Sequence, residues 1–456
     1  MRFLAIAQVS ASRDASPCVR IGVLGLFHPH QLTVRAPAGR ALVLAAGEDR
    51  IILEKSSGLE LANVRISGSG VLVVAGKHVV RAPRITISGR QKEPVDFNLA
   101  VPGKIDRHYY GTLEIGQSAG NLVAIVSMDL ETAVASVVAA ENALDTPLEA
   151  LKAQAIATRS YFVAGRGRHH DFDFCDTTHC QFLREPPAPG SAAAKAVAAT
   201  SDLVLAYEGE PFAAMYTRSC SGRTRTPTEM RLPSAAYPYF PVECKYCREH
   251  PAHWVRRMSA EDAAPLQSFD EAARLKIVRR LGWSAVPSND FEMRKERDQV
   301  VLKGTGYGHG IGLCQAGAKA MAEEGADFEK ILSHYFPNTT IVHRPAAKRF
   351  AGTAQEGLRT DLFSARDELQ AGMRGNQDEQ EEVFSYIPLE KRVDHPVREM
   401  RDRALRELPV WFGQWYAQTG RPSIPPEPWL RAQLLQALYT IGALSLAHLQ
   451  LHRPGD

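Results

Sequence analysis

The sequence predicts an α+β fold with a strand-rich N-terminal region, a core of mixed helices and strands, and a helical C-terminal extension. Short β-branched runs separated by Gly, Pro or Ser occupy the N-terminal region, as expected for strands. Helical periodicity follows them, and it returns near the C-terminus after a polar stretch. We therefore expect four regions, at residues 1–105, 106–345, 346–385 (a linker) and 386–456.

The composition is that of an ordinary soluble globular protein. The chain has 456 residues, of which 45% are hydrophobic and 23% are charged. Its 54 Lys and Arg nearly balance its 51 Asp and Glu, for a formal net charge of +3. Because nucleic-acid recognition needs a concentrated basic surface, we do not expect a nucleic-acid partner.

Strands are expected from Val19 to about Val126. Each is a short run of β-branched and apolar residues, with turn-forming residues between the runs. In chain order the runs are VRIGVL, QLTVRA, RIILE, VLVVAG, RITISG, YYGTLEI and NLVAIVSMDL.

Helices are expected after these strands. A short one covers 131–140, and a longer one begins at Thr146 and runs to about Val163. For the longer helix, Thr146 as N-cap, Pro147 at the first position and Glu149 form a capping box. The remaining expectations are a hairpin around Glu208-Gly209 and helices near 270–281 and 315–324.

Neither end of the chain predicts a clear membrane segment. The N-terminal stretch MRFLAIAQVSASRDASPC has a shorter apolar run than a typical signal peptide. No Asp, Glu, Lys or Arg occurs between Arg431 and Arg453, but Gln433, Gln436 and Thr440 recur there at helical spacing. That pattern favours a buried amphipathic helix, so membrane anchoring is not expected.

A single acid, Glu141, stands at the edge of an alanine- and valine-rich run. If it is buried, apolar neighbours raise its pKa, and a carboxyl group poised near neutrality can donate and accept a proton. Arg159 could return towards it if the two helices pack as a hairpin, and a guanidinium group suits hydroxyl-rich or carboxylate-bearing substrates. The alternative is a hydrated helix end at Glu141 and an ordinary surface residue at Arg159.

The stretch RHHDFDFCDTTHCQF holds several candidate metal ligands. Two thiolates and two imidazoles could close a tetrahedral zinc site. A disulfide between the two cysteines, or free thiols, is the alternative. The candidate ligands are His169 or His170, Cys175, His179 and Cys180.

A second cluster, CKYCREHPAHW, offers another possible zinc site. It combines a Cys-x2-Cys pair with two histidines at three-residue steps, and a more distant cysteine could join them. These candidates are Cys244, Cys247, His250, His253 and, as the remote ligand, Cys220. The chain has 7 cysteines, so at least one is unpaired, and Cys18 and Cys314 are the candidates.

Alternating glycines mark the stretch GTGYGHGIGLCQAGAKAMAEEG. Such a loop lets the backbone approach a ligand closely, with His309 at its centre. No register fits the dinucleotide-binding pattern Gly-x-Gly-x-x-Gly, so nucleotide binding is not expected. The alternative is a tight turn with a hydrogen-bonded histidine.

Together these stretches resemble the stage II sporulation protein D family (SpoIID/LytB domain) of bacterial cell-wall enzymes. Four blocks occur in the family's order from about Tyr109 to Ile341: YYGTLEI, VVAAENALDTPLEALKAQAIATRSYF, CDTTHCQF and GYGHGIGLCQAGA, with LSHYFPNTTI closing the last. Two departures stand out. Asn142-Ala143 replaces the usual Met-Pro after the acid, and Cys220-Ser221-Gly222 replaces a double glycine.

The resemblance implies a lytic transglycosylase that acts on peptidoglycan glycan strands, with 106–345 as the catalytic domain. It places the catalytic acid on Glu141 and a basic partner on Arg159, and it implies substrate contacts at Lys152, His309 and Gln315. It also implies a structural zinc ion at the first cysteine and histidine cluster, and a location in the cell envelope.

Two other functions remain open at the level of sequence. The resemblance allows a non-catalytic glycan-binding protein that enhances a cell-wall amidase, which would then be a protein partner. A zinc hydrolase is the other, but it needs an open coordination position, whereas four protein ligands imply a closed structural site.

Overall fold

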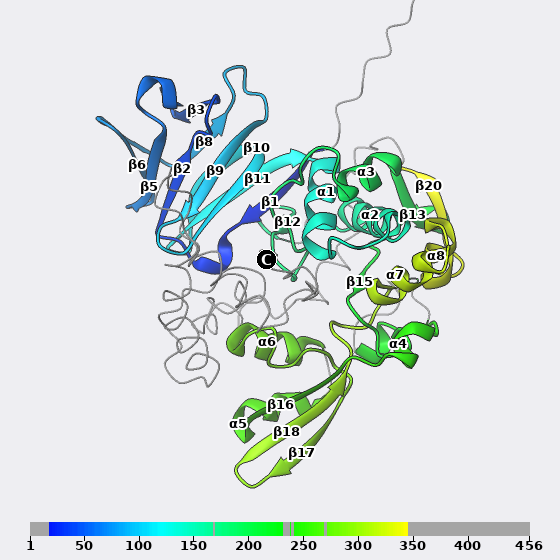
Figure 1. Ribbon diagram of the computed structural model, residues 1–456. Helices are drawn as coiled ribbons and strands as arrows, with labels where there is room; N and C mark the ends of the chain where they lie inside the picture. Colours follow the sequence, from blue (N-terminus) through cyan, green and yellow to red (C-terminus); the bar gives the residue numbers. More distant parts are fainter. Residues whose placement is uncertain (1–17, 167–168, 231–237, 239–240, 269–270, 345–456) are drawn as a thin grey trace, which may run out of the picture. The chain divides into compact units, whose positions relative to one another are not determined.

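The computed structural model describes residues 18–166, 169–230, 238, 241–268 and 271–344 (Figure 1). The chain divides into two compact units, and the described residues belong to the first, Met1–Arg280 with Ala285–Gly375, except for Leu281–Ser284. The predicted linker, the C-terminal extension and most of the N-terminal stretch considered as a signal peptide lie outside the described residues.

The described part has an α+β fold, and its largest element is a 12-stranded sheet. The main path through the sheet is β12-β1-β11-β10-β9-β2-β5-β6-β7, while β8 joins β10 to β3, and β3 pairs with β4. The strands are β1 (Cys18–Val23), β2 (Gln31–Arg35), β3 (Ala41–Ala46), β4 (Asp49–Glu54), β5 (Leu61–Ser67), β6 (Gly70–Ala75), β7 (His78–Ala82), β8 (Ile85–Ser88), β9 (Val95–Val101), β10 (Ile105–Ser118), β11 (Asn121–Asp129) and β12 (Phe174–Cys175).

Alternating burial explains why these runs form antiparallel strands. In β2 and β3 every second side chain is buried, as at Leu32 and Val34, while those between are partly exposed. A strand with one face on the core has this period of two. The strand prediction is confirmed at all seven runs, whereas β3, β5, β7 and β9 were not predicted.

Strand β10 links the N-terminal strands to the rest of the fold. Its first half pairs with β9, and its second half pairs with β11 and β8. The change of partner falls at Gly111, where a Cβ atom would lie 2.5 Å from the carbonyl oxygen of Ser127. The boundary predicted between residues 105 and 106 coincides with the start of this strand, and it stays a prediction.

The helices gather around α2, whose side chains are buried almost throughout. It contacts α1, α3, α7, α8 and β13, and its alanines allow this close packing. The helices are α1 (Leu130–Glu141), α2 (Leu148–Ala164), α3 (Ala192–Ala199), α4 (Lys245–Glu249), α5 (Ala260–Ala263), α6 (Glu271–Leu281), α7 (Gln315–Glu323) and α8 (Phe328–Tyr335). The smaller sheets contain β13 (Leu203–Tyr207), β14 (Glu210–Pro211), β15 (Tyr216–Thr217), β16 (His253–Ser259), β17 (Phe291–Glu296), β18 (Gln299–Thr305), β19 (Leu313–Cys314) and β20 (Thr340–His343).

The helix predictions are confirmed at α1, α2, α6 and α7, and the predicted hairpin is β13–β14. The capping box, however, is wrong. Pro147 occupies the N-cap position of α2, and no side chain caps the helix there. Glu149 instead forms a 2.6 Å ion pair with Lys152 and accepts a 3.0 Å hydrogen bond from the backbone N–H of Phe328.

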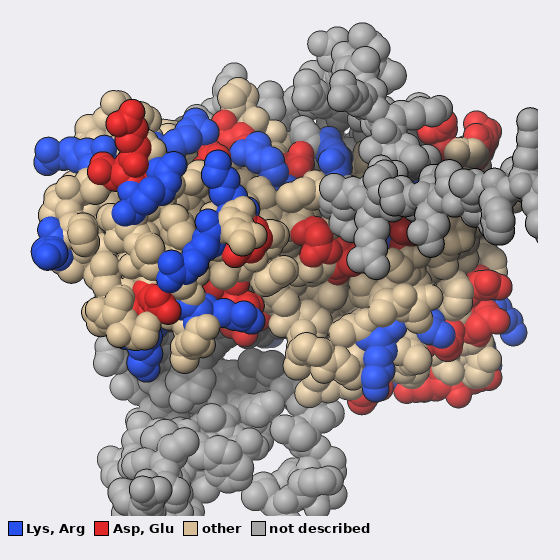
Figure 2. Space-filling model, turned by 90° about the horizontal axis from the view of Figure 1, so that it is seen from above, with Lys and Arg blue, Asp and Glu red and all other residues tan. Residues whose placement is uncertain are grey.

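Basic and acidic side chains are interspersed on the described surface seen in Figure 2. This distribution agrees with the near balance of charge in the sequence. Within the described residues, none of the helices has the length and apolar character needed to cross a membrane.

Candidate active site

Glu141 is the last residue of α1, and the fold fixes this helix at both ends. At its start, Asp129 at the end of β11 accepts a 3.0 Å hydrogen bond from the backbone N–H of Thr132. At its end, the side chain of Asn142 donates to the carbonyl oxygen of Val138 at 2.9 Å. The asparagine that departs from the family pattern therefore caps the helix that carries the acid.

The surroundings of Glu141 poise its carboxyl group near neutrality. Burial raises the pKa of Glu141 to about 7, although the residue keeps partial solvent access. A hydrogen bond from the backbone N–H of Phe182, the charges of Arg184 and Arg218, and a hydrogen bond with Tyr216 act in the opposite direction. The group can therefore be neutral or ionised at physiological pH, as an acid that later acts as a base requires.

Tyr216, in β15, connects Glu141 to the loop after β12. Its hydroxyl donates to Oε1 of Gln181 and lies within hydrogen-bonding reach of the Glu141 carboxyl group. Burial raises the pKa of Tyr216 well above its usual range, so the phenol stays protonated. Tyr216 is thus a neutral hydrogen-bonding partner of the acid.

Two arginines place positive charge near the acid. The guanidinium of Arg184 stacks on the ring of Phe182, with its central carbon 3.5 Å from the ring centroid. Burial lowers the pKa of Arg184 to about 10, which still leaves it charged at neutral pH. Arg218 is exposed and lies over the ring of Tyr307. Both charges favour the ionised form of Glu141.

A buried ion pair anchors the loop that carries Gln181 and Arg184. Asp176 lies 3.1 Å from Arg107 in β10, and both side chains are almost fully buried. The same carboxylate accepts a 3.1 Å hydrogen bond from the backbone N–H of Leu24. Burial raises the pKa of Asp176, and the neighbouring arginines oppose this shift. The loop is therefore fixed to the large sheet.

Gln315 contacts the backbone of Glu141, whereas His309 contacts the backbone of Tyr216. Among the described residues, no recorded interaction joins either side chain to the Glu141 carboxyl group. The side chain of Gln315 donates to the backbone carbonyl of Glu141 at 3.1 Å. Nδ1 of His309 accepts a 3.0 Å hydrogen bond from Ile311, and its ring donates to the carbonyl of Tyr216. Burial lowers the pKa of His309, which keeps the ring neutral.

The glycine-rich loop packs its backbone against the strand that carries Tyr216. Gly312 has a φ of 75°, and a Cβ atom there would lie 2.2 Å from the carbonyl oxygen of Met215. That carbonyl accepts the backbone N–H of Leu313 at 3.1 Å. Gly312 is therefore needed for this close approach, and His309 bonds to the backbone carbonyl of Tyr216 in the neighbouring strand.

The expectation that Arg159 returns towards Glu141 is corrected by the structure. Arg159 is fully buried and binds both carboxylate oxygens of Glu131, at 2.8 and 2.6 Å. It also donates to the carbonyl of Leu203 at 3.0 Å. Glu131 and Glu141 are ten residues apart in one helix, which is about 15 Å along its axis. Arg159 therefore clamps the opposite end of α1.

Lys152 occupies a packing position between two helices. Its amine pairs with Glu149 and lies 5.6 Å from the ring centroid of Phe328 in α8. These contacts join α2 to α8. A substrate contact by Lys152 stays a prediction.

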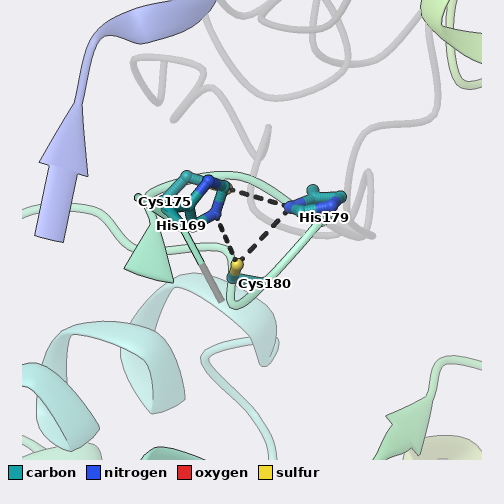
Figure 3. Close-up of side chains that lie close together, drawn as sticks. All are labelled: His169, Cys175, His179 and Cys180. Atoms are coloured by element: carbon teal, nitrogen blue, oxygen red, sulfur yellow. Dashed lines mark hydrogen bonds between the residues drawn. The ribbon is translucent and has the colours of Figure 1, made fainter. Parts of the chain in front are cut away.

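The first candidate metal cluster comes together in the loop around β12. The four side chains point towards one another in Figure 3. Nε2 of His169 lies 3.2 Å from the sulfur of Cys180, and Nδ1 of His179 lies 3.5 Å from the sulfurs of both Cys175 and Cys180. All four ligand atoms lie within 4.8 Å of one another. His170 is excluded, because its exposed ring pairs with Asp171 at 2.7 Å.

This cluster fits a zinc ion. Bonds of about 2.0–2.3 Å in a tetrahedral site separate neighbouring ligand atoms by about 3.3–3.8 Å, close to the separations found here. Hydrogen bonds from Cys180 and the two imidazoles hold the pKa of Cys175 well below its usual range. That thiol is therefore disposed to be the thiolate that a metal binds. The cysteines are not joined by a disulfide.

The second cluster differs from its prediction in two ways. The sulfurs of Cys220, Cys244 and Cys247 gather with that of Cys314, which was expected to be unpaired. His250 and His253 are exposed and lie outside the cluster. A ring nitrogen of His250 lies 3.2 Å from the carbonyl oxygen of Tyr246, while His253 begins the edge strand β16. The two histidines were predicted as ligands because they follow Cys247 closely in the sequence. In the fold, α4 and β16 direct the histidine side chains away from the thiols.

Sequence reasoning missed several residues around the acid. Gln181 lies in one of the blocks that carry the family resemblance and Arg184 follows it, so proximity to that block could have found them. Tyr216 and Arg218 carried no signal, because the fold alone brings β15 to the end of α1.

Comparisons with known proteins give the chain its relatives. The family described as stage II sporulation protein (SpoIID) matches residues 118–207. An uncharacterized protein of Brachyspira hyodysenteriae is 27% identical over 267 residues, covering 51% of this chain and 72% of that protein. Stage II sporulation protein D of Bacillus amyloliquefaciens is 26% identical over 264 residues, covering 48% and 75%. The amidase enhancer of Bacillus subtilis is 41% identical over 61 residues, covering 13% of this chain and 9% of that protein.

Proposed function

Because the chain belongs to the stage II sporulation protein D (SpoIID) family, we propose that it is a peptidoglycan lytic transglycosylase. It would act in the cell envelope on glycan strands, including strands whose stem peptides have been removed. The observation that carries the proposal is the state of Glu141, a partly accessible carboxyl group whose pKa is raised to about 7. A transglycosylase needs one such group rather than the carboxylate pair of a hydrolase.

In the first step Glu141 acts as a general acid. Its proton passes to the glycosidic oxygen between N-acetylmuramic acid and N-acetylglucosamine, and the bond from that oxygen to C1 of the muramic ring breaks. Positive charge develops at C1, and the carboxylate left on Glu141 is stabilised by Arg184, Arg218 and the backbone N–H of Phe182.

In the second step the same carboxylate acts as a base. It takes the proton from the C6 hydroxyl of the muramic ring, and the C6 oxygen bonds to C1. The product carries a 1,6-anhydro ring, and Glu141 returns to its protonated form. No water enters the reaction, so one group whose pKa lies near neutrality serves both steps.

The neighbours of Glu141 would position it and tune its pKa. Tyr216 holds the carboxyl group from one side, and Gln315 holds the backbone at the same residue. Arg218 is exposed enough to reach a bound glycan as well. We assign to Arg218 the role of basic partner that the family resemblance implied for Arg159.

We also propose that His169, Cys175, His179 and Cys180 hold a structural zinc ion. Four protein ligands leave no open position for a substrate or a reactive water. The ion would stabilise the loop between β12 and Gln181. The residue after Gln181 is Phe182, whose backbone N–H donates a hydrogen bond to Glu141.

A second candidate function has one observation in its favour. The match to the amidase enhancer suggests that the chain binds glycan strands and stimulates a cell-wall amidase without turnover of its own. The state of Glu141 argues for the enzyme, since a binding protein has no need of a carboxyl group poised near neutrality.

Mass spectrometry of the soluble products from peptidoglycan freed of stem peptides separates the two functions. The proposed enzyme releases fragments with 1,6-anhydro-muramic ends, which are lighter by one water than hydrolysis products. Reducing ends would instead identify a hydrolase. An absence of products, together with faster peptide release by an added amidase, would favour the enhancer.

A further inference from the structure

Four cysteines far apart in sequence meet in the core beside α7. Cys220 precedes α4 in the chain, Cys244 and Cys247 lie at the start of and within α4, and Cys314 immediately precedes α7. All four are at most 2% exposed. Their sulfur atoms lie within 4.8 Å of one another, and those of Cys247 and Cys314 are 3.5 Å apart.

This arrangement matches a closed tetrathiolate site. Zinc–sulfur bonds of about 2.3 Å in a tetrahedron separate neighbouring sulfurs by about 3.8 Å. A disulfide would bring two sulfurs to about 2.05 Å, whereas the structure has all four cysteines as free thiols. Four sulfurs grouped around one point are the donor set of structural zinc sites.

Two hydroxyl groups lie against sulfur atoms of the cluster. The hydroxyl of Tyr335 lies 3.3 Å from the sulfur of Cys244, and that of Ser219 lies 3.4 Å from the sulfur of Cys247. Hydroxyl groups beside metal-bound sulfurs can donate hydrogen bonds that orient and stabilise the ligands. At Gly317 in α7, a Cβ atom would lie 2.5 Å from the sulfur of Cys244, so glycine leaves the room that the cluster occupies.

We propose that Cys220, Cys244, Cys247 and Cys314 bind one zinc ion as a structural site, separate from the cluster at His169. The ion would join three chain segments, two of which lead directly to residues that contact Glu141. Cys314 pairs with Thr217 in the β15–β19 ladder, next to Tyr216, and it directly precedes Gln315. The site therefore sets the position of two residues that hold Glu141, and this reading does not depend on the reaction assigned to the protein.

The test is the zinc content of the full chain and of three matched variants. We expect about two zinc ions per chain in the native protein and in Cys18→Ser, whose cysteine lies outside both clusters. Cys247→Ser and Cys180→Ser should each retain about one. If Cys180→Ser lost one zinc ion and Cys247→Ser kept the native zinc content, the proposal would be overturned.

Cobalt substitution distinguishes the two sites by their ligands. The cobalt-loaded protein should have six thiolate ligands, four in one site and two in the other. Cys247→Ser should lose the four-thiolate site, so its thiolate-to-cobalt absorbance should fall by about two thirds. Cys180→Ser loses two thiolates, and its absorbance falls by about one third. Equal falls in the two variants would contradict the assignment.

A measurement on the native chain covers the case in which Cys247→Ser fails to fold. Titration with a mercurial thiol reagent should release zinc in two portions that together equal about two ions per chain. Release of one ion, with Cys220, Cys244, Cys247 and Cys314 recovered as free thiols or disulfides by mass spectrometry, would overturn the proposal. Absorbance typical of an iron–sulfur cluster in the purified protein would also overturn the proposal of a zinc site.

Discussion

At the scale of single residues, the chemistry rests on one carboxyl group that opposing forces hold near neutrality. Burial raises the pKa of Glu141, while Phe182, Arg184, Arg218 and Tyr216 moderate the rise. The acid could be predicted from the sequence, because apolar residues flank it and a family pattern contains it. Phe182 and Arg184 lie in or beside another block of the family pattern, but Tyr216 and Arg218 could not be predicted, because they follow the acid by 75 and 77 residues and carry no motif of their own.

The pH dependence of the reaction follows from this balance. The first step needs protonated Glu141, so kcat/KM should have its maximum value below about pH 7 and fall as the pH rises through about 7. Arg218→Ala removes a charge that lowers this pKa, so the fall should move to higher pH. Arg294→Ala, at an exposed position in β17, should leave the profile unchanged. A shift to lower pH in Arg218→Ala would contradict the electrostatic account.

The same pKa predicts a gain in stability when the acid is removed. Folding raises the pKa of Glu141 from 4.5 to about 7, so ionisation progressively destabilises the folded state above about pH 4.5. Glu141→Gln cannot ionise, and its free energy of unfolding at about pH 8 should exceed the native value by on the order of 3 kcal/mol.

Urea unfolding of both proteins at about pH 8 and about pH 4 checks this prediction, because the difference should vanish at the lower pH. A variant less stable than the native protein at the higher pH would show that the Glu141 carboxylate is not disfavoured in the folded state.

At the scale of elements, the position of Glu141 depends on how α1 is clamped between its neighbours. The buried guanidinium of Arg159 joins the first turn of α1 to α2 and to the start of β13. The element types of α1 and α2 were predictable from periodicity. The pairing of Arg159 was not, since sequence spacing alone does not say which end of α1 faces a residue in α2.

Arg159 should therefore matter for stability rather than for the reaction itself. Arg159→Met leaves Glu131 and the carbonyl of Leu203 without their partner, which should lower the free energy of unfolding by about 3 kcal/mol. Arg81→Met, at an exposed position in β7, should change it by less than about 0.5 kcal/mol.

Urea unfolding gives the free energies, and turnover measured where Arg159→Met is still fully folded separates the two roles. The clamp predicts native turnover under those conditions. If Arg159→Met had native stability but no turnover, Arg159 would instead take part in the reaction.

At the scale of the whole molecule, the described part combines a large sheet, helices gathered around α2 and two cysteine clusters. The α+β class was predictable from runs of β-branched residues followed by helical periodicity. Three members of the cluster of Cys220, Cys244, Cys247 and Cys314 were predicted from the sequence, and the fourth was not. Near neighbours in sequence suggested histidines, whereas the fold supplies Cys314 from a distant segment.

Removal of metal should weaken the fold without changing the reaction. A chelator that strips the zinc bound at the clusters should lower the melting temperature by roughly 10 °C. The fragments released by any protein that stays folded should keep their 1,6-anhydro ends. Calorimetry with measured zinc content tests the first expectation. Complete loss of activity at an unchanged melting temperature would place the metal in the reaction.

The most direct test of the account compares the rates at which anhydro-muramic products are released by the native protein, Glu141→Gln and Glu324→Gln. Glu324 is an exposed acid at the end of α7, so its variant controls for the loss of one carboxylate. We predict a rate lower by about 10²–10⁴-fold in Glu141→Gln and a native rate in Glu324→Gln. Equal rates in all three proteins would show that Glu141 is not the acid of the reaction.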